Sequence, residues 1–181
     1  SDDPSSQALA SVAYTGADAN GKALNQVLNV NLAYFDASTL PDGGTYPQYT
    51  DRVIAHEMAH AVMGRTMNYA TGLPKWFIEG SAEALQGADE RLAADTAGGT
   101  STAAILTAFN ADDVSGSDGY SGGYAAVRYM HDKIKAAGGQ GIKDIMSYLN
   151  KNAGATLDQA LTNASKGAFG SEADFDTKFN A

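Results

Sequence analysis

The chain has 181 residues, 44% of them hydrophobic, and a formal net charge of −9 with only 12 Lys and Arg. This length favours a single domain spanning residues 1–181, and the scattered basic residues offer no patch for nucleic acid or an anionic membrane. No apolar run approaches the roughly 18 residues of a membrane span, and the opening SDDPSS does not match a secretion signal.

The N-terminal part, about residues 1–50, contains the clearest strand pattern. From Val27 to Phe35, apolar residues such as Leu28 and Val30 alternate with Asn29 and Asn31, which is typical of a half-buried strand. The following segment, DASTLPDGGTYP, is rich in turn formers and is predicted to be a loop.

Two helices are predicted in the middle part, residues 51–88. The first runs from about Asp51 to Met67, with Met58 and Val62 among its apolar residues. The second begins near Pro74 and ends at Gly87.

The C-terminal part, residues 89–181, is predicted to be helical. Its helices are expected at 102–109, 123–137, 141–151, 157–164 and 172–180. Thr156, and Ser171 with Asp174, can cap the last two. The segment NADDVSGSDGYSGG, residues 110–123, is predicted to be a long loop. The fold class is therefore α+β, mainly helical, with a small N-terminal sheet.

The first helix carries HEMAH, residues 56–60, which has the H-E-x-x-H pattern of a zinc site. Residues four apart share a helical face, so His56 and His60 can bind one ion. Glu57 is rotated by about 100° and can act as general base toward water at the metal. The chain has no cysteine, so imidazole and carboxylate are the available ligands. Alternatively, the histidines make ordinary polar contacts and Glu57 is solvated.

The second helix supplies candidates for a third ligand. Glu79 and Glu83 also lie four apart on one face, so one can ligate while the other orients a histidine through its free N–H. Gly80 between them predicts a close packing contact, because glycine costs about 1 kcal/mol in a helix relative to alanine. The alternative is a solvent-facing acidic pair.

HEMAH followed by EGSAE, residues 79–83, resembles the gluzincin zinc metallopeptidases. The W-F-x-E-G-x-A-E form is similar to bacterial collagenase-type catalytic domains, and residues 51–91 look most like the peptidase domains embedded in bacterial flagellins, the flagellinolysins. The resemblance implies a zincin-like catalytic domain, Glu79 as third zinc ligand and Glu83 as the outer carboxylate. It also implies an extracellular place on the bacterial flagellum, as part of a flagellin filament.

Gluzincins also provide a tyrosine that stabilises the oxyanion, in a Y-x-x-G-aromatic context. YSGGY, residues 120–124, has this form, so the resemblance assigns the role to Tyr120, with Tyr124 as the alternative. Both could instead be packing aromatics beside a loop.

The remaining features are assigned to structural roles. Trp76 and Phe77 are expected in the core, and His131 on the surface. A Ca²⁺ site is conceivable in the acidic segment, although its spacing matches no EF-hand. Its oxygen donors would be Asn110, Asp112, Asp113 and Asp118.

The resulting expectation is a zinc-dependent endopeptidase that acts on proteins or peptides, with an extended substrate along the Val27–Phe35 strand. Two other functions stay open. The chain could be a non-catalytic filament surface domain with a structural zinc site, or a zinc hydrolase that acts on a different acyl substrate.

Overall fold

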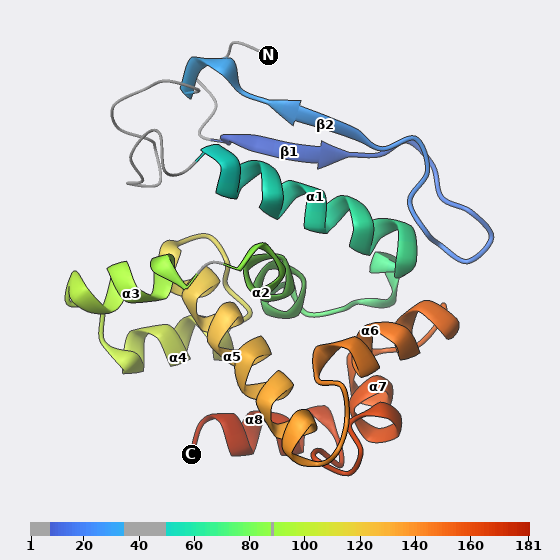
Figure 1. Ribbon diagram of the computed structural model, residues 1–181, viewed down its shortest axis with the longest axis vertical. Helices are drawn as coiled ribbons and strands as arrows, with labels where there is room; N and C mark the ends of the chain where they lie inside the picture. The colour runs from blue at the N-terminus through green and yellow to red at the C-terminus, as the bar shows by residue number, and fades with distance from the viewer. Residues whose placement is uncertain (1–7, 35–49, 88) are drawn as a thin grey trace.

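The computed structural model describes residues 8–34, 50–87 and 89–181, and this part of the chain is mainly helical with one two-stranded sheet (Figure 1). The strands are β1 (Ala10–Ala13) and β2 (Val27–Val30). The α-helices are α1 (Thr50–Thr66), α2 (Lys75–Gln86), α3 (Glu90–Ala97), α4 (Thr102–Asn110), α5 (Ser117–Ala136), α6 (Ile142–Lys151), α7 (Leu157–Ala164) and α8 (Glu172–Phe179). Short 3₁₀ helices cover Leu32–Tyr34 and Tyr69–Thr71. The expected fold class, α+β and mainly helical, is confirmed.

The sheet is an antiparallel hairpin in which Ala10 pairs with Val30 and Ala13 with Val27. The predicted strand is too long, because Asn31 ends β2. Asn31 is buried, and its side chain accepts the Ala33 backbone N–H and donates to the Ala8 carbonyl. The chain then turns into the 3₁₀ helix. Phe35 and the predicted loop after it lie outside the described residues.

Helix α1 lies between the hairpin and α2 (Figure 1). The predicted apolar face is partly wrong, since Met58 and Val62 are 48% and 59% exposed. Met63 and Met67 are buried instead and belong to the main core.

The core forms where α2, α4, α5 and the C-terminal helices meet. Trp76 and Phe77 are buried there, as predicted. The Trp76 ring stacks on Phe175 of α8, with 5.4 Å between ring centroids. Because Trp76 and Phe77 stand at the start of α2, this packing fixes the helix two residues before Glu79.

Helices α2 and α5 cross at two glycines. A Cβ on Gly80 would lie 2.2 Å from the carbonyl carbon and oxygen of Gly123, so only glycine permits this approach. The close packing predicted at Gly80 is therefore confirmed. The predicted loop at 110–123 is wrong for its last seven residues, because α5 begins at Ser117.

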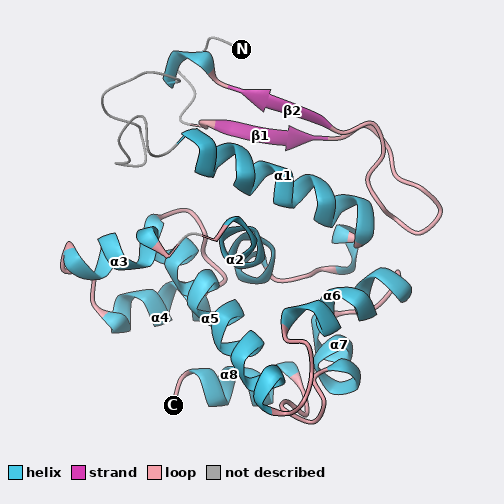
Figure 2. Cartoon of the chain, viewed as in Figure 1, coloured by secondary structure: helices cyan, strands magenta, loops and turns pink. Residues whose placement is uncertain are grey.

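Helices α4, α6, α7 and α8 agree with the predicted ranges, whereas α3 has no counterpart among the predicted helices. Figure 2 shows the strands confined to the one hairpin. Thr156 forms a capping box with Gln159, and the Ser171 hydroxyl accepts the Asp174 N–H. His131 is half-buried, not a free surface residue, because its Nδ1 accepts the Ile142 N–H where α6 begins. Within the described ranges, no helix is both long and apolar enough to span a membrane.

Candidate metal centre

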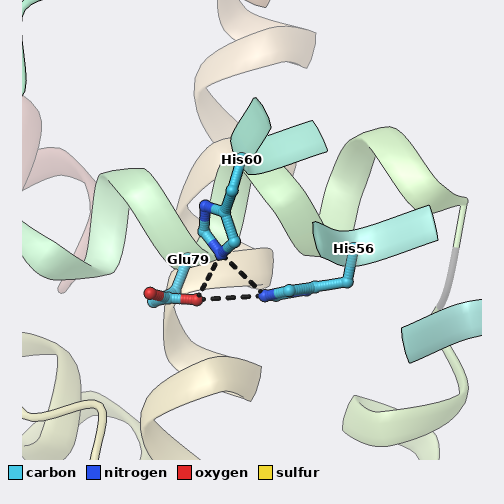
Figure 3. Close-up of side chains that lie close together, drawn as sticks. All are labelled: His56, His60 and Glu79. Atoms are coloured by element: carbon cyan, nitrogen blue, oxygen red, sulfur yellow. Dashed lines mark hydrogen bonds and ion pairs between the residues drawn. The ribbon is translucent and has the colours of Figure 1, made fainter. Parts of the chain in front are cut away.

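His56 and His60 of α1 and Glu79 of α2 converge on one point (Figure 3). The Nε2 atoms of the two imidazoles are 2.9 Å apart. Glu79 Oε2 lies 3.1 Å from the His56 nitrogen and 3.0 Å from the His60 nitrogen. The four-residue spacing places the imidazoles on one face of α1, where the rings meet edge to face, and the contact between α1 and α2 brings the carboxylate to them.

The donor set fits a small divalent cation. Ligand atoms about 2.0–2.1 Å from a tetrahedral zinc ion lie roughly 3.3 Å apart, close to the three separations in this triangle. Each ring nitrogen carries either one hydrogen or one lone pair, so the three contacts cannot all be linear hydrogen bonds. One cation satisfies all three atoms at once. The group formed by His56, His60 and Glu79 could therefore hold a metal ion.

The electrostatics of the group favour positive charge. Burial opposes the charged form of His56, but contacts with Glu79 and Glu83 outweigh it and raise the His56 pKa to about 9. Burial likewise favours the neutral acid of Glu79, yet the hydrogen bonds with His56 and His60 lower the Glu79 pKa to about 2. A bound cation would supply the positive charge that a proton on His56 otherwise provides.

Glu83 stands behind the first histidine, as the sequence analysis expects of an outer carboxylate. Its Oε1 lies 3.1 Å from His56 Nδ1, in ion-pair contact, although the pair misses the angular range of a good hydrogen bond. The Glu83 side chain is 3% exposed, and its other oxygen accepts a hydrogen bond from Gln86. The alternative of a solvent-facing pair is wrong for Glu79 and Glu83, which are 21% and 3% exposed.

The triangle lies at the wall of a pocket of about 360 Å³. Glu57 and Tyr120 also line this pocket. Strand β1 contributes Ser11 and Val12, whereas no residue of β2 is among the lining residues. Of the two strands, β1 and not the described part of the Val27–Phe35 segment lines the pocket, because β1 packs more closely on α1.

Tyr120, not Tyr124, faces the cluster. Its ring centroid lies 6.0 Å from that of His56, and burial, with Glu79 adding, raises the Tyr120 pKa to about 12. The phenol is therefore a proton donor throughout the neutral range. Tyr124 lies one turn further along α5 and is not among the lining residues.

The acidic residues considered for calcium have other partners. Asp112 accepts the Trp76 backbone N–H at the start of α2, and Asp113 accepts the Ser115 N–H. Asp118 accepts the N–H of the next residue, and Asn110 exchanges hydrogen bonds with Asn180. Within the described residues, His56, His60 and Glu79 are the one group of three such side chains close enough to hold an ion. The structure gives the calcium site no support.

Two further side chains at the site, Tyr69 and Arg91, are not predicted from the sequence. Tyr69 lines the pocket and its hydroxyl donates to the His60 carbonyl at 3.4 Å. Arg91 on α3 contacts both Glu83 and Tyr120. Tyr69 belongs to no motif, and Arg91 is the last residue of the 51–91 stretch that carries the resemblance, which assigns it no role.

A scan against protein-family models found no match, and searches of curated proteins and of solved structures found no significant match either. No relative's activity can therefore be carried over to this chain. What the structure shows is a mainly helical chain with a small sheet and a His–His–Glu group able to hold a metal ion.

Proposed function

We propose that this chain is a zinc-dependent endopeptidase of the gluzincin type. One observation carries the proposal: the three candidate ligand atoms lie at the wall of a pocket that Glu57 and Tyr120 also line. A structural zinc site is closed by four protein ligands, whereas a catalytic site has three and keeps a position open to substrate. An ion at the wall of a 360 Å³ pocket fits the catalytic type.

Zinc is the proposed metal because the donors are two imidazoles and one carboxylate, a set used by catalytic zinc sites. His56, His60 and Glu79 would hold the ion. When bound there, zinc supplies Lewis acidity that polarises a carbonyl and acidifies water.

Each remaining side chain has a defined task in peptide hydrolysis. Glu57, next to His56 and at the pocket, accepts the proton of the attacking water and returns it to the amine that leaves. Tyr120 donates its hydroxyl hydrogen to the oxygen on which negative charge develops. Glu83 holds His56 in its ligating orientation.

The substrate is proposed to lie extended along β1. Among the described residues, β1 has a strand partner, β2, on one edge and none on the other. Ser11 and Val12 of β1 line the pocket. Main-chain pairing to a free strand edge binds peptides with little sequence selection, which suits an endopeptidase. The targets are proposed to be extracellular proteins, and the chain to be carried on a bacterial flagellar filament. This location is supported by the resemblance of residues 51–91 to flagellin-embedded peptidase domains.

The test is cleavage of a peptide library by the purified protein, followed by mass spectrometry. We expect internal peptide bonds to be cut by the zinc-loaded protein, and no cleavage after a chelator removes the metal. Binding of one zinc ion with every peptide left intact would overturn the proposal in favour of a structural zinc site. Hydrolysis of another acyl substrate alone would favour a different zinc hydrolase.

A further inference from the structure

Arg91 of α3 contacts two side chains of the proposed site. Its Nε lies 3.6 Å from Glu83 Oε1, and its guanidinium carbon lies 4.9 Å from the centre of the Tyr120 ring. The same Glu83 oxygen faces His56 Nδ1 at 3.1 Å. The Arg91 guanidinium therefore contacts both the carboxylate that supports His56 and the tyrosine that lines the pocket.

Arg91 gives Glu83 the opposite charge that its burial requires. The Glu83 side chain is 3% exposed, and a buried carboxylate is strongly disfavoured without a charged partner. An imidazole that ligates a cation through Nε2 is neutral, so His56 then offers Glu83 an N–H but no charge. Arg91 is always protonated and is itself only 17% exposed, so it can balance Glu83 in the metal-loaded protein.

Helix α3 is fixed to the part of α5 that carries Tyr120. Asp95 accepts hydrogen bonds from Ser117 at 2.9 Å and from Ser121 at 2.5 Å, on either side of Tyr120 in sequence. Arg91 lies one turn before Asp95 and on the same face of α3. The attachment of α3 therefore determines where the guanidinium meets the tyrosine ring.

We propose that Arg91 is a positioning residue, which holds the Glu83 carboxylate against His56 and the Tyr120 ring beside the metal group. Two effects follow: Arg91 supports metal affinity through Glu83, and it supports turnover through Tyr120. The second effect rests on the proposed peptidase function. The first depends only on the metal group.

The effect of Arg91 on metal affinity is tested by measuring zinc binding in competition with a chromophoric chelator. We expect Arg91→Met to weaken zinc binding by about tenfold, at the lower end of the effect of losing a residue behind a metal ligand. In a Glu83→Gln background the same substitution should have no further effect, because the link is already broken. The matched control is Arg52→Met. It removes a different ion pair of α3, the one between Arg52 and Glu90, and Arg52 contacts neither Glu83 nor Tyr120.

Arg91→Lys separates the two effects. Lysine keeps the charge near Glu83 but lacks the flat guanidinium that packs on an aromatic ring. We expect zinc affinity within a few-fold of wild type, with kcat for peptide cleavage reduced about tenfold and KM unchanged. This loss of kcat should disappear in a Tyr120→Phe background.

A third readout reports on position without activity. Only three histidines are present, so ¹⁵N-histidine labelling gives three imidazoles to follow by NMR. In the zinc-loaded protein, Arg91→Met should shift the His56 Nδ1 signal and leave that of His131 unchanged. Arg91→Gln, which also removes the charge beside Glu83, serves the same comparison if the methionine variant does not fold, as judged by circular dichroism.

The proposal is overturned if Arg91→Met binds zinc as tightly as wild type does. It is equally overturned if the double variant loses zinc affinity by the product of the two single-variant losses, since Arg91 and Glu83 would then act independently. It is also overturned if the zinc-loaded His56 signal does not move. Should the zinc-loaded wild type cleave no peptide, the peptidase proposal fails, while the affinity cycle and the NMR comparison still decide the role of Arg91.

Discussion

Gly80 of α2 and Gly123 of α5 meet backbone to backbone. A Cβ on Gly123 would lie 2.6 Å from the Trp76 carbonyl oxygen, and a Cβ on Gly80 would clash with the Gly123 carbonyl group. Glu79 precedes one of these glycines and Tyr120 lies one turn before the other, so the crossing sets the spacing of ligand and tyrosine.

Gly80→Ala should therefore destabilise the protein by about 1–3 kcal/mol, the usual range for overpacking a well-packed contact. Chemical denaturation measures this change. Gly154→Ala is the control, since a Cβ there meets nothing within 4 Å and the substitution should be neutral or slightly stabilising. Equal stability of the two alanine variants would contradict the close crossing.

Zinc binding should release a proton from His56. Its pKa of about 9 means that the ring is protonated at neutral pH, and ligation requires the neutral ring. Zinc affinity should thus rise about tenfold per pH unit between roughly pH 7 and 8, and level off above about pH 9. Calorimetry in buffers of different ionisation enthalpy would detect the released proton. An affinity independent of pH over this range would contradict the assignment.

The same shift predicts how the metal-free protein responds to pH. A raised histidine pKa contributes stability that is fully present below pH 6.5 and is lost as pH rises through about 9. The melting temperature of the metal-free protein should fall over this interval. A His56→Asn variant should lack this part of the pH dependence, and an unchanged slope in that variant would assign the effect to another group.

Glu57→Gln should abolish most hydrolysis and leave zinc binding intact. Glu57 lines the pocket but does not belong to the group of candidate ligands. Loss of a general base typically lowers the rate by about 10²–10⁴-fold. Cleavage rates and zinc stoichiometry of the purified variant give the two readouts. A variant that keeps zinc and cleaves peptides as fast as wild type would refute the hydrolytic role.

Tyr120→Phe should lower kcat by about 10²-fold with little change in KM, because its hydroxyl would act on charge that develops only in the transition state. Tyr124→Phe is the matched control, one turn along the same helix and outside the pocket lining. A larger loss in Tyr124→Phe than in Tyr120→Phe would reverse the assignment.

The two halves of the metal group could be predicted from local geometry, whereas the choice of Glu79 over Glu83 as third ligand came from the gluzincin resemblance, and the meeting of the halves depends on the α1–α2 contact. His56 and His60 meet through the four-residue repeat of one helix, and Glu79 and Glu83 share a face of the next. The helix boundaries also follow from local signals, such as Gly87 in the left-handed conformation at the end of α2.

The surroundings of the group could not be predicted, because they depend on tertiary contacts. The start of α5 is rich in glycine and serine, a composition that predicts a loop. In the fold, these small residues let α5 approach its neighbours, as Gly123 does at Gly80. That packing offsets their low helix propensity. Arg91 reaches the site from α3, an eight-residue helix that has no fully buried residue and that is not among the predicted helices.

The predicted strand is present as β2, but its C-terminal end is wrong for a related reason. Alternation alone placed the Asn31 side chain on a solvated face, yet Asn31 is 6% exposed and forms the hydrogen bonds that end β2. A hydrogen-bonding asparagine of this kind cannot be distinguished by periodicity from one that points to solvent.

The central claim is that one divalent cation is bound by His56, His60 and Glu79. Anomalous scattering at the zinc edge, from crystals grown with Zn²⁺, tests it most directly. The account predicts a single peak at about 2.0–2.2 Å from both Nε2 atoms and a Glu79 carboxylate oxygen. A metal-replete crystal with no peak between these three side chains, or with the side chains turned apart, would contradict it.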